Sequence, residues 1–315
     1  MLDALLGMAS HVCHHLDPRR RLLVVFLHRV GGKAGLSTET VRRQLAFVAK
    51  HYEVVHPSQM AACGRRRRVA MVTVDDGHAD VYSEFFPIAC SLGLPFGLCP
   101  STDFLLRRQW LWFDKFDWAI GQAAPGGECG IGSKQIRLAD RASIAAFRQW
   151  LKEQPPGLRD EILAMVFHGL RVEVPPEPLE EYRPVNQQEL KEMLSSGLLE
   201  LVGHTVTHTA LPVLANAERT QELMQSKREL EELAGKKVHA FCYPNGDFDE
   251  RSDAAVRQAG FQMAFTTLEG MNWQATMNPF QLKRMHVHRR DAVFLKQASG
   301  LGDLQRLVGF QRSKD

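Results

Sequence analysis

The chain has 315 residues, of which 44% are apolar and 24% are charged, proportions that are usual for a soluble globular protein. Its net charge of +3 and its isoelectric point near 8.5 are too mild to indicate a nucleic-acid partner. No apolar run reaches the roughly 20 residues that a membrane-spanning helix requires. The length allows one large α/β domain, with or without an insertion.

The first 20 residues predict a short amphipathic helix and lack the basic start and cleavage site of a secretory signal. A basic cluster, Arg19 to Arg21, follows the apolar positions. We expect this segment either to pack on the domain or to make peripheral contact with an anionic membrane surface. The apolar residues at helical spacing are Leu2, Leu5, Leu6 and Ala9.

Short apolar runs alternate with helical segments over residues 21–103 and 186–300, the pattern of an α/β domain. Ser37 is a predicted helix cap, and Asn186 with Glu189 forms a predicted capping box. Apart from a short edge segment at 54–55, we count about seven strands separated by helices, which predicts a parallel sheet. The predicted strands cover residues 21–30, 69–76, 94–100, 198–203, 238–243, 261–267 and 282–288.

Residues 104–185 interrupt this alternation. Aromatic residues crowd one part of the segment, and prolines punctuate the rest. We expect a mostly helical insertion that forms a lid over one end of the main domain, and a short tail at 301–315. The aromatic cluster, which includes Trp112, fits either the core of this insertion or a face on which a sugar ring stacks.

Asp75 and Asp76 end the predicted strand at 69–76, and Gly77 allows a sharp turn after them. Two adjacent carboxylates in a confined pocket require a cation or a strong base nearby, whereas on the surface they would be a solvated turn. The other polar candidates also follow strands. Because the carboxyl ends of parallel strands meet at one edge, this arrangement predicts the site of a (β/α) barrel.

His204 and His208 follow the predicted strand at 198–203 and are four residues apart. On the first turn of a helix they would project to the same side and share one metal ion. Together with Asp76 they make a two-histidine, one-carboxylate set, which leaves coordination positions open for water and substrate. A lone histidine pair would be weak support, but the Asp-Asp-Gly turn at another strand end strengthens it.

Four motifs in combination resemble the polysaccharide deacetylases with chitooligosaccharide deacetylase homology. That resemblance implies a distorted (β/α) barrel in which Asp75 is the general base and Asp76, His204 and His208 hold a divalent metal. We expect Zn²⁺, with Co²⁺, Ni²⁺ or Fe²⁺ as alternatives. The motifs are TVDDG at 73–77, HTVTH at 204–208, FCYPNG at 241–246 and LHRV at 27–30.

The sequence departs from the family pattern at two places. Cys242 stands where the family has an arginine that orients the catalytic aspartate, and we expect Arg284 to replace it. The family's acid is a histidine near the carboxyl end. Here His286 and His288 both fit, alternation along a strand puts them on one face, and we prefer His286.

The resemblance implies metal-dependent hydrolytic N-deacetylation of an acetamido sugar in a surface polysaccharide, a lipopolysaccharide or a lipid-linked glycan precursor. The metal acidifies water and polarises the amide carbonyl, Asp75 accepts a proton, and a histidine protonates the leaving amine. The alternatives are a non-catalytic carbohydrate-binding barrel and a deformylase or other amide hydrolase acting on a sugar carrier. The expected substrate-binding residues are His28, Tyr243, Pro244, Asn245 and Trp112.

The expected partner is an acetamido-sugar glycan or glycolipid, and the sequence makes no prediction of oligomeric state. Six cysteines without a framework spacing favour reduced thiols. Since the family acts on surface glycans, we expect a cytoplasmic protein that works at the inner face of the membrane during glycan assembly.

Overall fold

The computed structural model describes residues 20–32, 35–60 and 68–299. The helix expected within residues 1–20 and the tail expected at 301–315 lie outside the described residues. Within this part of the chain no helix is long and apolar enough to cross a bilayer. The four cysteines in it, Cys90, Cys99, Cys129 and Cys242, are free thiols.

Seven parallel strands form the main sheet, in the order β7-β4-β3-β1-β11-β9-β8. The sheet curls so far that its two end strands meet at an isolated bridge between Gly203 and Phe241. The predicted α/β class and distorted (β/α) barrel are therefore confirmed. The seven strands are β1 (Arg21–Leu27), β3 (Arg68–Asp76), β4 (Phe96–Pro100), β7 (Leu199–Leu201), β8 (Ala240–Cys242), β9 (Met263–Glu269) and β11 (Leu282–His286).

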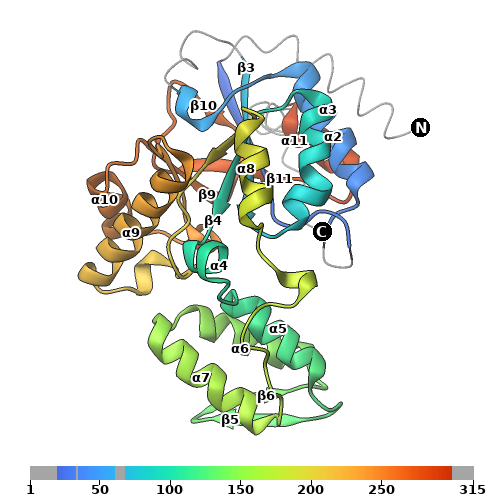
Figure 1. Ribbon diagram of the computed structural model, residues 1–315, viewed down its shortest axis with the longest axis vertical. Coiled ribbons are helices and arrows are strands. Elements are labelled where there is room, and N and C mark those ends of the chain that lie inside the picture. Colours follow the sequence, from blue (N-terminus) through green and yellow to red (C-terminus); the bar gives the residue numbers. More distant parts are fainter. Residues whose placement is uncertain (1–19, 33–34, 61–67, 300–315) are drawn as a thin grey trace, which may run out of the picture.

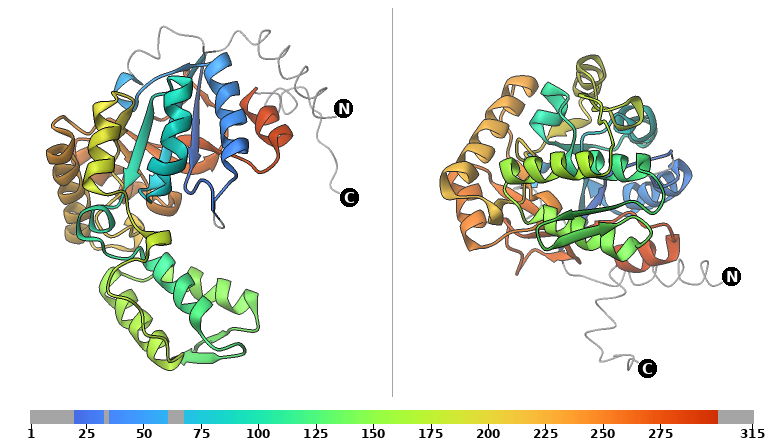
Figure 2. Two further views of the ribbon diagram at one scale, coloured as in Figure 1. Left: turned by 45° about the vertical axis from the view of Figure 1, so that its right-hand side comes forward. Right: turned by 90° about the horizontal axis from the view of Figure 1, so that it is seen from below.

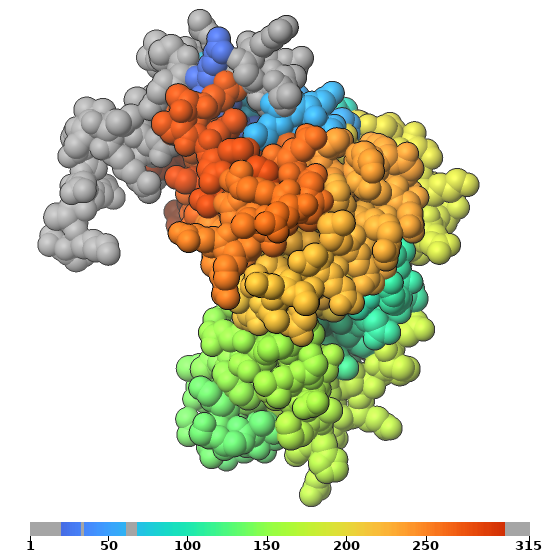
Figure 3. Space-filling view, turned by 90° about the vertical axis from the view of Figure 1, so that its left-hand side faces the viewer, coloured from blue at the N-terminus to red at the C-terminus, as the bar shows by residue number. Residues whose placement is uncertain are grey.

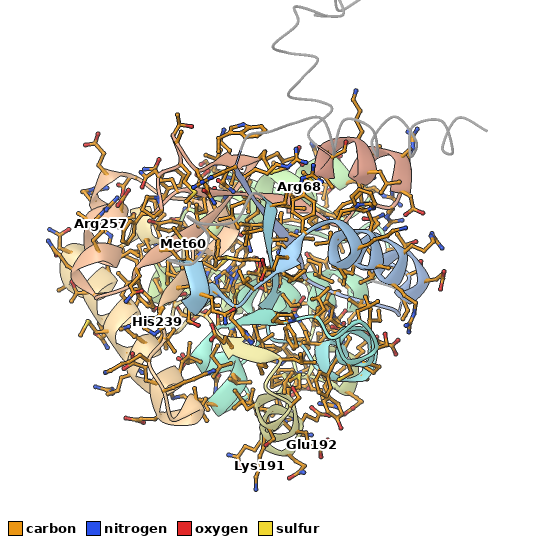
Figure 4. All side chains as sticks on the ribbon, turned by 90° about the horizontal axis from the view of Figure 1, so that it is seen from above. Met60, Arg68, Lys191, Glu192, His239 and Arg257 are labelled. Carbon is orange, nitrogen blue, oxygen red and sulfur yellow. The ribbon has the colours of Figure 1, made fainter. Side chains whose placement is uncertain are left out.

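Two short strands pair with the amino ends of β3 and β1, beside the main strand order. β2 (Glu53–Val54) pairs parallel with β3, and β10 (Asn272–Trp273) pairs antiparallel with β1. Figure 4 looks down on this end of the barrel, where β3 begins at Arg68. The predicted edge segment at 54–55 therefore lies at the amino ends of the parallel strands.

Apolar side chains fill both faces of the strands, which is why the strands are apolar without alternation. One core lies inside the barrel, and another packs the strands against the helices. Figure 1 shows these helices around the sheet. The covering helices are α2 (Thr38–His51), α3 (Phe86–Leu92), α8 (Gln187–Ser195), α9 (Asn216–Ala234), α10 (Glu250–Gln258) and α11 (Asp291–Ala298).

The predicted helix ends are present with their caps. Ser37 accepts a hydrogen bond from the Thr40 N–H, and the capping box of Asn186 with Glu189 forms in both directions. Gly235 ends α9 in the left-handed region. One departure is a π-helical turn, η2 (Val81–Phe85), which leads into α3.

The insertion forms a lobe beneath the carboxyl ends of the strands (Figure 2) and has a hydrophobic core of its own. In Figure 3 it is a distinct lower body, in green, that meets the barrel. Trp112 belongs to its core. α4 (Thr102–Arg107) precedes the lobe and packs against the barrel, where Leu105 joins the core of the main domain. The lobe contains α5 (Trp112–Gln122), the hairpin β5 (Glu128–Ile131) with β6 (Lys134–Arg137), α6 (Arg141–Lys152) and α7 (Pro156–Gly169).

Arg21 is not part of a surface basic cluster, and this expectation is wrong. The side chain is fully buried at the start of β1. Its Nη1 donates to the Ser299 carbonyl at 3.1 Å, and its guanidinium lies 5.7 Å from the centre of the Tyr52 ring. Arg21 therefore ties the first strand to the end of α11 and cannot contact a membrane.

Candidate active site

Asp75 and Asp76 lie side by side in one buried cavity, with 2% and 3% of their surfaces exposed. Successive residues of a regular strand point to opposite faces, so the backbone must break this alternation. It does so at Asp76, whose φ is 72°, and at Gly77, whose φ is 95°. A Cβ on Gly77 would lie 2.9 Å from the Pro100 Cβ, so this turn requires glycine.

Asp76, His204 and His208 converge on one point. The Asp76 Oδ1 lies 3.2 Å from the His208 Nε2 and 3.6 Å from the His204 Nε2. Burial alone would raise the pKa of Asp76, but the two imidazoles beside it hold it well below its usual range. The three side chains are buried, and their ligand atoms all lie within 4.8 Å of one another.

The hydrogen bonding and the chemistry of these three side chains fit a divalent metal. The Asp76 Oδ1 is buried without a hydrogen-bond partner. The His204 Nδ1 lies 2.7 Å from the Cys242 carbonyl, so Nδ1 carries the proton and Nε2 presents its lone pair to the site. Two imidazole nitrogens and a carboxylate oxygen are ligands that zinc and its neighbours in the first transition series accept.

The local structure that unites the histidines differs from the prediction. No helical turn follows β7, and residues 203–210 are a loop. Thr205 and His208 adopt φ values of 64° and 54° there, which bend the chain so that the two imidazole rings meet edge to face with centroids 4.8 Å apart. The prediction that His204 and His208 lie together is therefore correct, but a bent loop brings them together and not a helical turn.

Arg284 lies against Asp75 as a two-point partner. Its Nη1 and Nη2 lie 2.8 Å from the Oδ1 and Oδ2 of Asp75, and its Nε donates to the Thr266 carbonyl. Burial alone would raise the pKa of Asp75, but the Arg284 charge and, after it, His28 lower it to about 2. Asp75 is therefore ionised at neutral pH. The sequence predicts Arg284 in place of the family's arginine that orients the catalytic aspartate, and Arg284 contacts that aspartate here.

A second cluster of potential metal ligands consists of Asp75, Cys99 and Cys242. The Cys242 sulfur lies 3.6 Å from the Asp75 Oδ2. The buried guanidinium of Arg284 already neutralises Asp75 and would repel a cation placed there. The chemistry of the donor groups therefore favours the histidine set for the metal.

His28, and not His286, is the histidine that faces the cavity near Asp75. The His28 Nε2 lies 3.9 Å from the Asp75 Oδ2. His286 stacks behind His28 with ring centroids 5.9 Å apart, and burial lowers its pKa. The His288 Nδ1 accepts a hydrogen bond from the Arg290 N–H, outside the cavity. The predicted alternation fails because β11 ends at His286.

The cavity has a volume of about 420 Å³ and is walled by both the barrel and the insertion. Of the expected substrate-binding residues, His28, Asn245 and Trp112 line it. Tyr243 and Pro244 do not: both are buried, and the Tyr243 ring packs on Phe241 and Phe248. The lining residues that the sequence did not reveal are Phe113, Ala145, Arg148, Gln149, Lys152 and Thr267.

Four of these unforeseen residues come from α6. Ala145, Arg148, Gln149 and Lys152 share one face of that helix by their spacing, but such spacing does not say what the face contacts. The Lys152 Nζ also lies 2.8 Å from the Asp247 Oδ2, which links the insertion to the loop after β8. The insertion is thus a wall of the site.

Comparisons with known proteins agree with this geometry. Residues 164–264 match the family model described as polysaccharide deacetylase. YxkH of Bacillus subtilis (strain 168), which carries the name of a polysaccharide deacetylase, is 27% identical over 86 residues, or 27% of this chain and 30% of that protein. The aligned segment therefore spans less than a third of that curated relative.

Solved structures extend the likeness in fold to most of the chain. A Streptococcus pyogenes deacetylase, PplD, solved with acetate, has a TM-score of 0.60 and 14% identity over 89% of this chain and 99% of its own. IcaB from Ammonifex degensii has a TM-score of 0.59 and 19% identity over 88% of this chain and 97% of its own.

The fold and the site define a distorted (β/α) barrel with a candidate metal centre of two histidines and one carboxylate. The match of residues 164–264 to the polysaccharide deacetylase model agrees with the resemblance that the sequence motifs carry.

Replacing Arg284 with methionine should lower the free energy of unfolding of the metal-free protein by about 3–5 kcal/mol, because Asp75 would be left as an unpaired buried charge. The double variant Asp75→Asn/Arg284→Met should recover part of this loss, since asparagine carries no charge. Urea denaturation in the presence of a chelator measures both. A double variant less stable than Arg284→Met alone would contradict the role of the ion pair.

Proposed function

We propose that this protein is a metal-dependent N-deacetylase of an acetamido sugar in a surface polysaccharide, a lipopolysaccharide or a lipid-linked glycan precursor. The observation that carries the proposal is the cavity in which an ionised Asp75, held by Arg284, lies beside the metal-ligand set of Asp76, His204 and His208. A base beside a metal site suits the metal-assisted hydrolysis of an unactivated amide.

Asp76, His204 and His208 would hold the ion, for which we propose Zn²⁺. When bound, such an ion supplies Lewis acidity, which polarises an amide carbonyl and acidifies water enough for a weakly basic carboxylate to deprotonate it. The hydrogen bond of His204 to the Cys242 carbonyl keeps its imidazole in the tautomer that binds metal.

Asp75 is the proposed general base. Arg284 fixes both carboxylate oxygens, so the base is ionised and its orientation is set before substrate arrives. The guanidinium in turn is held by the Thr266 carbonyl and the Thr73 hydroxyl, at 2.7 and 3.1 Å. Arg284 is therefore a positioning residue for the base.

His28 is the proposed proton donor to the leaving amine, in place of the predicted His286. It lines the cavity and approaches Asp75, whereas His286 supports it from behind. Trp112 and Phe113 give the insertion side of the cavity an apolar wall on which a sugar ring can pack, and Asn245 lies on the barrel side.

Asp76→Ala, His204→Ala and His208→Ala should each lose bound zinc and deacetylase activity together, because each removes a ligand. Metal content of the purified proteins and acetate release from N-acetylated oligosaccharides and glycolipids measure the two effects. Full zinc occupancy in any two of these variants would show that the ion is held elsewhere.

Asp75→Asn should keep its zinc and lose activity by about 10²-fold or more, because a general base acts in the chemical step. The same assays apply, with mass analysis of the released acid to separate acetate from formate. Zinc loss as complete as that of Asp76→Ala would mean that the roles of the two carboxylates are reversed.

His28→Gln should lower kcat by about 10²-fold, and His286→Gln by less, because only His28 faces the cavity. Both variants should retain zinc, since neither residue is a ligand. A larger loss in His286→Gln than in His28→Gln would restore the residue predicted from sequence as the acid.

A further inference from the structure

The loop that carries both histidine ligands has a costly backbone. Residues 203–210 belong to no helix or strand, and two non-glycine residues, Thr205 and His208, adopt left-handed φ values. Such conformations persist only where surrounding contacts impose them. The contacts that impose them here therefore determine where the two imidazoles lie.

Glu222, on α9, makes the densest set of these contacts. Its Oε2 accepts hydrogen bonds from the backbone N–H groups of Val206 and Thr207, at 2.6 and 3.1 Å. Its Oε1 accepts from the Thr207 hydroxyl at 2.8 Å. The residue is only 8% exposed, so these bonds to a carboxylate are largely shielded from water.

A directed chain of hydrogen bonds continues from Glu222 to the insertion. Thr207 gives its only hydroxyl proton to Glu222, so it accepts from the Thr209 hydroxyl, 2.7 Å away. Thr209 in turn accepts from the Arg159 Nη2 at 3.0 Å. Arg159, on α7, is 2% exposed, and its guanidinium lies 5.0 Å from the centre of the Trp112 ring.

The opposite side of the loop is held by backbone donors at the start of α4. The Thr102 and Asp103 N–H groups donate to the carbonyls of Thr205 and Val206, at 3.2 and 3.0 Å. These donors fix the carbonyls but leave the amides of Val206 and Thr207 to Glu222. Among the described residues, Glu222 is the only side chain that accepts from these two amides.

We propose that Glu222 is a positioning residue for the metal centre, which sets the affinity for the ion by fixing the loop between His204 and His208. This inference rests on the metal site of the proposed function. Glu222 touches neither the ion site nor the cavity, and it acts through the backbone of the loop.

The test is Zn²⁺ affinity of the full-length Glu222→Gln variant, measured by competition with a chromogenic chelator. Glutamine keeps the shape but removes the charge and replaces one acceptor with a donor. We expect zinc binding about 10- to 100-fold weaker than in the wild type. The matched control is Glu232→Gln, at an exposed position of the same helix, which should bind zinc like the wild type.

A second readout separates positioning from support of the fold. Loading with saturating Co²⁺ should give Glu222→Gln an altered visible spectrum, because the ligand geometry changes. Thr207→Val keeps the carboxylate and removes one hydroxyl, so it should weaken zinc binding even if Glu222→Gln does not fold. Wild-type affinity in a folded Glu222→Gln, or in Thr207→Val if the first variant does not fold, would overturn the proposal.

The same experiment distinguishes this inference from the proposed function. A wild-type protein that binds no Zn²⁺ would refute the metal site itself and the inference with it. Wild-type zinc binding with unchanged affinity in the variants would refute the role of Glu222 alone.

Discussion

The adjacent carboxylates of Asp75 and Asp76 share one buried cavity. Because two like charges are buried together there, each carboxylate needs its own compensating partners, and these partners form the rest of the site. Asp75 obtains a guanidinium fixed at two points, and Asp76 obtains two imidazoles whose nitrogens face it. A buried carboxylate without such partners would take up a proton. The division gives the two acids different environments, which is the usual basis for giving them different roles.

This arrangement requires a strained backbone around the cavity. The described residues include six non-glycine residues with positive φ, and four of them, Asp76, Thr205, His208 and Asn245, line or flank the cavity. A strained backbone of this kind persists only where the surrounding structure is rigid. The barrel, whose sheet is packed on both faces, and the contacts of α9 with residues 203–210 provide that rigidity. The site is thus preorganised by the fold and does not need substrate to assemble it.

The barrel was predictable because its strands are apolar on both faces and its helices carry caps such as Ser37 and Gly235. The ligand set was predictable from residue types at strand ends. The geometry that joins His204 to His208 was not, because propensities do not reveal left-handed residues in a loop. The sequence also did not reveal that Arg21 and Tyr243 are buried. Their residue types suggested a surface charge and a substrate-binding residue, and only the packing around them shows otherwise.

The most direct test of the account is X-ray absorption spectroscopy of the zinc-loaded protein at the zinc edge. Ligation by Asp76, His204 and His208 predicts a first shell of nitrogen and oxygen near ~2.0–2.1 Å, with the outer-shell scattering of two imidazoles. Sulfur scattering near ~2.3 Å would place the ion between Cys99 and Cys242 and would contradict the account.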